Sequence, residues 1–387
     1  MKQPIEIRVI RSLADVSAAD WDACAGPGEP FLSYGFLSLL EETGSANRSS
    51  GWGGAHLIAR TDSLPSGGKR VVAVVPCYTK SHSWGEYIFD HGWAEAYQRA
   101  GGRYFPKLLA GVPFTPVPGP RLLVHPDAPL GTREALLSAL GTMMIDAGCS
   151  SVHLNFLRDA DLAAARASGW LPRMGFQFHW PNQGYTTFED FTGKLTSHRR
   201  KELRRERRQA AAATGLRLVT LPGPEVRPRD WRRFHDLYVA QVDKKWGSAY
   251  LTEGFFAGLG ERLGDTALMA AAFDGDELVA GALHVRGADS LYGRNWATAV
   301  DVPFLHFELC YYRAIDYAIE HHIPRVEAGA QGEHKLQRGY LPTPTWSAHL
   351  LRDTGFHAAV GKWLEKETLA VEETIAAYTE HTPYREG

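Results

Sequence analysis

The order of strand-like and helix-like segments in the first half of the sequence is repeated in the second half. The first half shows one strand, two helices, two β-runs, a helix and a strand, at residues 5–10, 19–25, 33–42, 55–60, 70–78, 132–147 and 151–156. The second half shows the same order at residues 216–221, 229–245, 253–263, 267–273, 277–285, 305–321 and 325–329, with a further strand at 290–296. Alternating apolar residues indicate the strands, and apolar residues at helical spacing indicate the helices. The repeat therefore predicts two related α/β domains.

Each predicted domain is a mixed twisted sheet flanked by helices. A boundary is expected near residues 181–184, where turn-forming residues separate two patterned regions. This gives an N-terminal domain at residues 1–181 and a C-terminal domain, carrying most of the candidate site, at residues 182–387. The total of 387 residues agrees with two domains, since a typical domain has about 100–150 residues.

Charge and cysteine spacing exclude several classes of protein. The formal net charge of −2 excludes a chain that is basic overall. The four cysteines lie far apart without a C-x-x-C pair, and no H-E-x-x-H occurs, so we predict neither a disulfide framework nor a metal site. No apolar run approaches the length of a membrane span, and the N-terminus lacks the apolar core of a signal peptide. We therefore expect a cytoplasmic protein without a membrane span.

The segment at residues 327–340 carries an unusual density of ionisable side chains. Two carboxylates, a histidine, a lysine, an arginine and three glycines share these positions. Glycine lets the backbone approach a ligand closely, and the polar side chains supply acid, base and anion-binding groups. A solvated loop with turn glycines would have the same composition. A ligand site and a surface loop therefore both remain open.

Several longer motifs resemble one known family. They include Phe31-Leu-Ser-Tyr-Gly-Phe-Leu37 and Leu291-Tyr-Gly-Arg-Asn-Trp296, and together they lie at residues 31–44, 104–121, 179–185, 243–247, 291–296, 305–312 and 327–340. With the repeated element order, they resemble the FemAB-like family of predicted N-acyltransferases, which uses the GNAT acyltransferase fold twice in tandem. Its relatives, the Fem-type enzymes, add amino acids to peptidoglycan precursors. The resemblance implies an enzyme that moves an acyl or aminoacyl group onto an amine of a small molecule or peptide.

Acyl transfer to an amine requires a proton acceptor, a group that stabilises the oxyanion and groups that position the donor. No Ser/His/Asp or Cys/His signature indicates a covalent intermediate, so direct attack is the simpler mechanism. The candidate bases are Glu333 and His334, with Glu327 behind them. The candidates for binding a phosphate or carboxylate are Lys335, Arg338 and Arg294.

Further candidate binding residues come from neighbouring segments. His306 and Glu308 lie in the first turn of the helix predicted at 305–321, where free backbone N–H groups favour an anion. A simple polar cap explains His306 equally well, and a hydrated helix end explains Lys245 and Trp246 equally well. The remaining candidates are Tyr292 and Gln331.

The donor is undecided between acyl-CoA and aminoacyl-tRNA, and no tightly bound cofactor is expected. In GNAT enzymes, a Gly-rich turn before the matching helix receives the cofactor pyrophosphate, whereas this chain has Asp301-Val-Pro-Phe-Leu-His306. A polar helix is predicted at residues 188–213, and its residues 198–208 carry seven Lys or Arg, a density that can bind tRNA phosphates. A solvated helix in which Glu202 pairs with Arg199 and Arg205 explains the same run.

A non-catalytic ligand-binding protein on the same fold is the alternative from another class. The density of Glu, His and Lys at residues 327–340 argues against it, because a scaffold does not require those groups. The sequence does not predict the oligomeric state.

Overall fold

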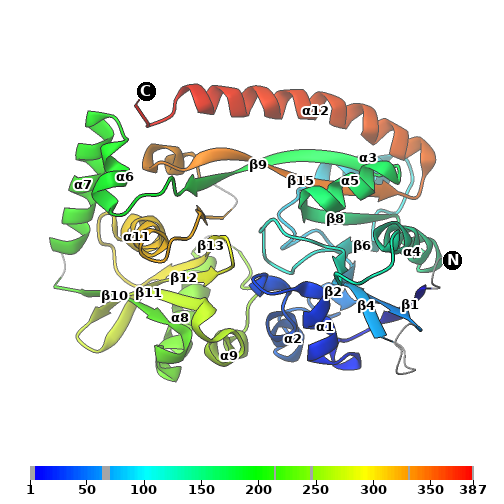
Figure 1. Cartoon of the computed structure of the whole chain (residues 1–387), viewed down its shortest axis with the longest axis horizontal. Coiled ribbons are helices and arrows are strands. Elements are labelled where there is room, and N and C mark those ends of the chain that lie inside the picture. Colours follow the sequence, from blue (N-terminus) through cyan, green and yellow to red (C-terminus); the bar gives the residue numbers. More distant parts are fainter. Residues whose placement is uncertain (1–4, 63–69, 213–214, 245–246, 330–331, 386–387) are drawn as a thin grey trace. The chain divides into compact units, whose positions relative to one another are not determined.

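A computed structural model describes residues 5–62, 70–212, 215–244, 247–329 and 332–385. The chain divides into two compact units. Unit 1 comprises Met1–Gly175 and Pro344–Glu373, and unit 2 comprises Phe176–Thr343 and Thr374–Gly387. Figure 1 shows the elements of both units coloured along the chain.

Unit 1 is built on a series of paired strands that ends with a strand from late in the chain. In spatial order the main strands are β1 (Ile5–Ile10), β3 (His56–Thr61), β4 (Arg70–Val75) with its continuation β5 (Cys77–Lys80), β6 (Lys107–Ala110), β8 (Ser151–Leu157) and β15 (Leu341–Leu351). Neighbours pair antiparallel, except that β6 and β8 are parallel. The short strands β2 (Trp52–Gly54) and β7 (Leu123–Val124) pair with β5 and β4.

The helices of unit 1 cover these strands and supply much of its core. They are α1 (Ala18–Ala25), α2 (Tyr34–Glu42), α3 (His91–Arg99), α4 (Thr132–Asp146), α5 (Asp159–Ala167) and the first part of α12 (Thr354–Glu380). Leu136 and Leu140 of α4 pack with Leu108 of β6 and Val152 of β8 in one buried cluster. This packing fixes the helix against the middle of the sheet.

Unit 2 repeats the strand order of unit 1. Its strands are β10 (Arg217–Pro222), β11 (Ala267–Asp274), β12 (Glu277–Arg286), β13 (Ser290–Thr298), β14 (Arg325–Glu327) and β9 (Leu171–Pro181), in that spatial order. Neighbours again pair antiparallel, except that β13 and β14 are parallel.

The helices of unit 2 lie on both faces of its sheet. They are α6 (Phe188–Gly193), α7 (Ser197–Ala212), α8 (Pro228–Asp243), α9 (Glu253–Leu263) and a helix formed by α10 (Leu305–Phe307), the π-helical turn η5 (Glu308–Tyr312) and α11 (Arg313–Glu320). The helices α8 and α9 cover one face, and α11 covers the opposite face (Figure 1).

The predicted α/β fold with tandem GNAT-like halves is confirmed. In each unit the first four strands in spatial order pair antiparallel with their neighbours. The fourth strand pairs parallel with the fifth, and the sixth strand pairs antiparallel with the fifth. The β-runs predicted at 70–78 and 277–285 occupy equivalent places, as β4 with β5 and as β12. In both units the sixth strand is not the next strand in the sequence. This strand is β15 in unit 1 and β9 in unit 2.

Several predicted elements differ in detail from the observed ones. The run at 70–78 is divided at Pro76 into β4 and β5, because proline has no N–H group to donate to a sheet. The polar helix predicted across 188–213 is two helices, α6 and α7, separated by residues 194–196. The structure also adds α5 and β9, which the sequence pattern did not predict.

The compact units do not divide the chain at a single point. The boundary between the units falls inside β9, after Gly175, and again inside β15, before Pro344. Residues 344–373 belong to unit 1 because β15 pairs with β8. The predicted ranges 1–181 and 182–387 therefore remain a proposal, from which the observed units differ.

Within the described ranges, no helix combines the length and the apolar character that crossing a membrane requires.

Candidate functional site

A cavity of about 100 Å³ lies in unit 2 where β13 and β14 part. The two strands pair only over residues 290–292 and 325–327, after which β13 continues to Thr298 while β14 ends. The polar side chains that line the cavity are His284, Arg294, Asn295, His306 and Tyr311. They come from β12, β13 and the helix that begins at Leu305. The cavity thus lies at the carboxyl ends of two parallel strands, where loops and side chains can meet a ligand.

Two local irregularities shape this cavity. A bulge in β13 sets Arg294 and Asn295 opposite the single residue Leu283, which disrupts the hydrogen-bond ladder there. The helix on the other side contains the π-helical turn Glu308–Tyr312, a distortion found frequently at functional sites. A β-carbon at Gly293 would make only ordinary contacts, at 3.5 Å from Cα of Ala328 and 3.7 Å from Nδ1 of His284.

His284 carries a proton acceptor that is buried in the wall of this cavity. Its side chain is only 3% exposed, and Nε2 lies 3.0 Å from the backbone oxygen of Leu309. A carbonyl oxygen can only accept, so Nε2 carries the proton and Nδ1 carries a lone pair. In the described part of the chain, Nδ1 is buried and has no hydrogen-bond partner. Burial lowers the pKa of His284 to about 4, so the ring is neutral near pH 7.

Aromatic side chains connect the cavity to the predicted polar segment. The ring of His306 lies 5.2 Å from that of Trp296 and 5.4 Å from that of Tyr311. The hydroxyl of Tyr311 and Nε2 of His334 share a hydrogen bond of 2.8 Å. Burial raises the pKa of Tyr311, so its hydroxyl remains protonated. Partial burial, together with the charges of Arg338 and Lys335, lowers the pKa of His334, so its ring is neutral and able to accept.

Glu327 ends β14 as a buried carboxylate held by its neighbours. One oxygen accepts from Nε of Arg325 at 2.9 Å and from the hydroxyl of Ser290 at 3.2 Å. The other oxygen lies 3.7 Å from Nε2 of His179. Burial raises the pKa of Glu327, and the attraction of Arg325 opposes that rise. Glu327 does not line the cavity, and Tyr292, which is buried in β13, does not line it either.

Two other predicted residues attach α7 to the rest of unit 2. Both oxygens of Glu206 accept from Nη2 of Arg338, at 2.8 and 2.9 Å. Glu308 accepts from Nε and Nη2 of Arg207, both at 3.1 Å. Arg338 and Glu308 are at least 95% buried in these pairs, which connect them to α7.

The remaining predicted residues are placed individually. Glu333 is exposed and accepts from the hydroxyl of Tyr378 at 2.5 Å. Lys335 is only 2% exposed, and its ammonium donates to the oxygen of Gly329 at 2.8 Å. Burial lowers the pKa of Lys335 to about 8. The predicted residues Lys245, Trp246 and Gln331 lie outside the described residues.

Of the predicted residues, the structure therefore brings Arg294 and His306 to the cavity and connects His334 to it through Tyr311. Sequence reasoning missed His284. The available signal was a single ionisable residue inside the apolar run of residues 278–285.

A family model matches residues 12–386, and its description is FemAB-like, peptidoglycan biosynthesis/recognition. No curated protein matches the chain. Among solved structures, the chain is similar to the C-terminal domain of a putative lysylphosphatidylglycerol synthetase from Agrobacterium fabrum. The identity is 11%, the match covers 90% of this chain and 96% of that one, and the TM-score is 0.53. At this identity the likeness concerns the fold alone.

Two further solved structures match over similar lengths. FemX is 11% identical, with 92% of this chain and 100% of that chain covered and a TM-score of 0.49. A tandem GNAT protein from the clavulanic acid biosynthesis pathway is 13% identical, with 90% and 98% covered and a TM-score of 0.44.

Proposed function

The chain belongs to the FemAB-like family, and from this premise we propose that it is an N-acyltransferase acting at the cavity between β13 and β14. The observation that carries the proposal is the acceptor nitrogen of His284, which is buried at this cavity without a hydrogen-bond partner in the described chain. An unsatisfied buried acceptor costs about 1–3 kcal/mol. A buried acceptor beside a cavity can receive a hydrogen bond or a proton from a ligand, and a transferase needs such a proton acceptor at its reacting centre.

The proposed reaction is direct attack of an amine on the donor carbonyl. The new C–N bond forms as the donor C–O or C–S bond breaks, and the proton lost by the amine passes to the leaving group. Nδ1 of His284 accepts this proton, with His306 beside it. Arg294 is proposed to bind the negative charge of the donor or of the oxyanion. Cys310 also lines the cavity, but desolvation raises the pKa of its thiol, which disfavours a covalent thioester route.

The proposed acceptor is the amine of a peptide of the peptidoglycan type. The family description, peptidoglycan biosynthesis/recognition, supports this class. Such an amine becomes a nucleophile once its ammonium form loses a proton, which agrees with direct attack assisted by a neutral histidine.

Aminoacyl-tRNA is the favoured donor, with acyl-CoA as the alternative. The helix α7 exposes Lys201, Arg204, Arg205 and Arg208 along one side. Within residues 5–385 as described, the guanidinium groups of the three arginines have no hydrogen bond or ion pair, whereas Glu202 pairs with Arg199 at 2.6 Å. Unpaired arginines on one helix face suit the phosphates of a nucleic acid.

The experiment supplies the purified protein with either donor and a panel of peptide amines, and detects the new amide by mass spectrometry. Amide formation with aminoacyl-tRNA supports the favoured donor, and amide formation with acyl-CoA alone supports the other. Binding of donor and amine without any amide, across the whole panel, supports the ligand-binding alternative and contradicts the proposed reaction.

A further inference from the structure

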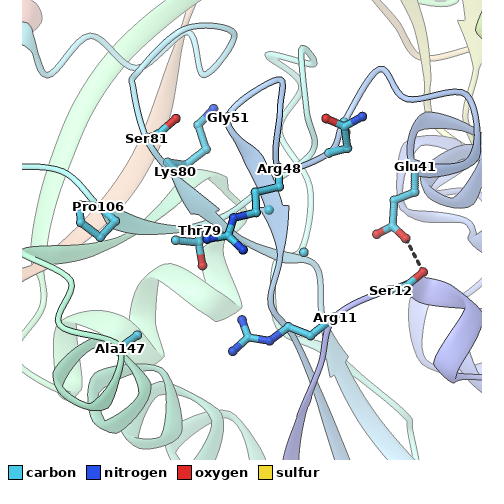
Figure 2. A pocket seen from close by; sticks show the side chains of 14 residues that line it. Arg11, Ser12, Glu41, Arg48, Gly51, Thr79, Lys80, Ser81, Pro106 and Ala147 are labelled. Atoms are coloured by element: carbon cyan, nitrogen blue, oxygen red, sulfur yellow. Dashed lines mark hydrogen bonds between the residues drawn. The ribbon is translucent and has the colours of Figure 1, made fainter.

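Unit 1 contains a cavity of about 960 Å³ that shares no lining residue with the candidate site in unit 2 (Figure 2). Its walls come from the residues after β1, the loop after α2, and the strands β2 and β5. We propose that this cavity binds an organic phosphate through Arg11 and Arg48, as a function separate from acyl transfer in unit 2.

Two arginines direct positive charge into the same space. Figure 2 shows the side chains of Arg11 and Arg48 extending into the space that the lining residues enclose. Neither guanidinium has a hydrogen bond or an ion pair among the described residues. Both residues are exposed, so solvent screens the repulsion between the two guanidinium groups, and an anion between them could accept hydrogen bonds from both. Arginine also matches phosphate geometry, because its planar fork can donate two parallel hydrogen bonds.

The carboxylate in the cavity wall does not neutralise these arginines. Glu41 accepts from the hydroxyl of Ser12 at 3.0 Å, from the backbone N–H of Leu13 at 2.9 Å and from Nε2 of His56 at 2.7 Å. Burial tends to raise the pKa of Glu41, but these hydrogen bonds outweigh burial and lower the pKa. Its oxygens are therefore bonded to the protein framework, and its negative charge remains in the cavity wall.

Lys80 belongs to the wall rather than to the open space. Its ammonium donates to the backbone oxygen of Trp84 at 3.3 Å and lies 3.5 Å from the ring centre of Trp52. Thr79 supplies a hydroxyl beside the arginines that can donate to a further oxygen of a ligand, whereas the amide of Asn47 donates to the oxygen of Gly44 and accepts from Ser49 and Ser50.

Glycine keeps room beside Arg48. A β-carbon at position 53 would lie 3.9 Å from Cγ of Arg48 and 3.7 Å from the backbone oxygen of Thr79, which are ordinary contacts. A larger side chain would extend into the cavity from there. The volume matches that of pockets for small organic ligands, which measure about 300–1,000 Å³. We therefore infer an organic phosphate rather than a bare inorganic ion.

The test measures binding by calorimetry, using inorganic phosphate, pyrophosphate and a nucleoside diphosphate as probes. Sedimentation with phosphatidylcholine vesicles, with and without phosphatidic acid, asks whether the phosphate is instead a lipid headgroup. The proposal predicts saturable binding of at least one phosphate probe or of the phosphatidic acid vesicles. Arg11→Gln and Arg48→Gln should each weaken it about tenfold or more, because each removes a charged hydrogen bond.

Two further variants keep the test specific. Gly53→Val should weaken binding while leaving both charges in place. Arg8→Gln is the matched control, since Arg8 is exposed on β1 and already paired with Glu6, so binding should be unchanged. Absence of binding to every probe overturns the proposal. So does binding that persists in Arg11→Gln and Arg48→Gln, or that falls equally in Arg8→Gln.

Discussion

His284 is the residue on which the proposed chemistry depends most. The single hydrogen bond from Nε2 to Leu309 fixes the tautomer and leaves Nδ1 as a base at the cavity. The sequence could not assign this role, because a lone histidine in an apolar strand is more often a satisfied core residue. Conversely, Arg338 and Glu308 have the residue types of an anion site, but their partners Glu206 and Arg207 lie more than a hundred residues earlier in the chain. The spacing of residues along the sequence cannot predict a pairing between residues so far apart.

Stability should depend on pH through His284. The unfolded ring has a pKa near 6.5, whereas burial lowers the folded value to about 4. Between these values the unfolded chain binds more protons, so the free energy of unfolding falls as pH falls from about 6.5 to about 4. His284→Gln keeps a donor for Leu309 but removes this titration, so its loss of stability over that range should be smaller. Urea unfolding at several pH values checks this, and parallel curves for both proteins would contradict it.

At the scale of elements, α7 has two faces with different tasks. Glu206 and Arg207 face inward and pair with Arg338 and Glu308, while Arg204, Arg205 and Arg208 are exposed. The sequence predicted the helix and its charge density, since both are local properties. It could not predict which charges are paired, because the partners lie on η5 (Glu308–Tyr312) and on the segment at 333–338. In contrast, the division of residues 70–78 into two strands follows from a local feature of the sequence, because Pro76 cannot donate a hydrogen bond to a neighbouring strand.

The inward face should matter for stability. Arg338→Ala leaves Glu206 buried without its cation, and breaking a buried pair costs about 3–5 kcal/mol. Arg204→Ala, on the exposed face, should change stability by no more than about 0.5 kcal/mol. Denaturant titration of both variants measures the difference. Normal stability of Arg338→Ala together with weakened donor binding would restore Arg338 to the binding role that the sequence suggested.

The outward face should matter for tRNA. Reversing the charge of Arg204, Arg205 and Arg208 should reduce the slope of log affinity against log salt by about 0.7–0.9 for each phosphate that the helix no longer neutralises. The control reverses three exposed charges elsewhere, at Arg99, Lys362 and Lys366. Filter binding at several salt concentrations measures both slopes. An equal reduction in both proteins, or tRNA binding that does not depend on salt, would remove the support for a tRNA donor.

At the scale of the whole molecule, the two units share one strand order, and each takes its last strand from a distant part of the chain. The repeat was predictable, because element order is visible in the periodicity of the sequence. The use of β15 in unit 1 was not predictable, since its pairing with β8 joins residues about two hundred positions apart. The predicted boundary at 181 places β15 in the C-terminal domain, whereas unit 1 includes residues 344–373.

This connection can be tested with fragments. Residues 1–181 alone leave the edge of β8 unpaired, so they should not unfold cooperatively. A chain in which residues 1–175 are joined by a flexible linker to residues 341–373 should regain a cooperative transition. Circular dichroism during thermal unfolding distinguishes the two. A cooperative transition of equal midpoint in both fragments would show that β15 is dispensable.

The central claim is that unit 2 transfers an acyl group at the cavity beside His284. The most direct measurement is the single-turnover rate of amide formation by the wild-type protein, by His284→Gln and by the control His321→Gln, which alters an exposed histidine at the end of α11. The account predicts transfer by the wild type, a rate lowered about 10²–10⁴-fold in His284→Gln with its fold retained, and a normal rate in the control. A folded His284→Gln protein that transfers at the wild-type rate would contradict it.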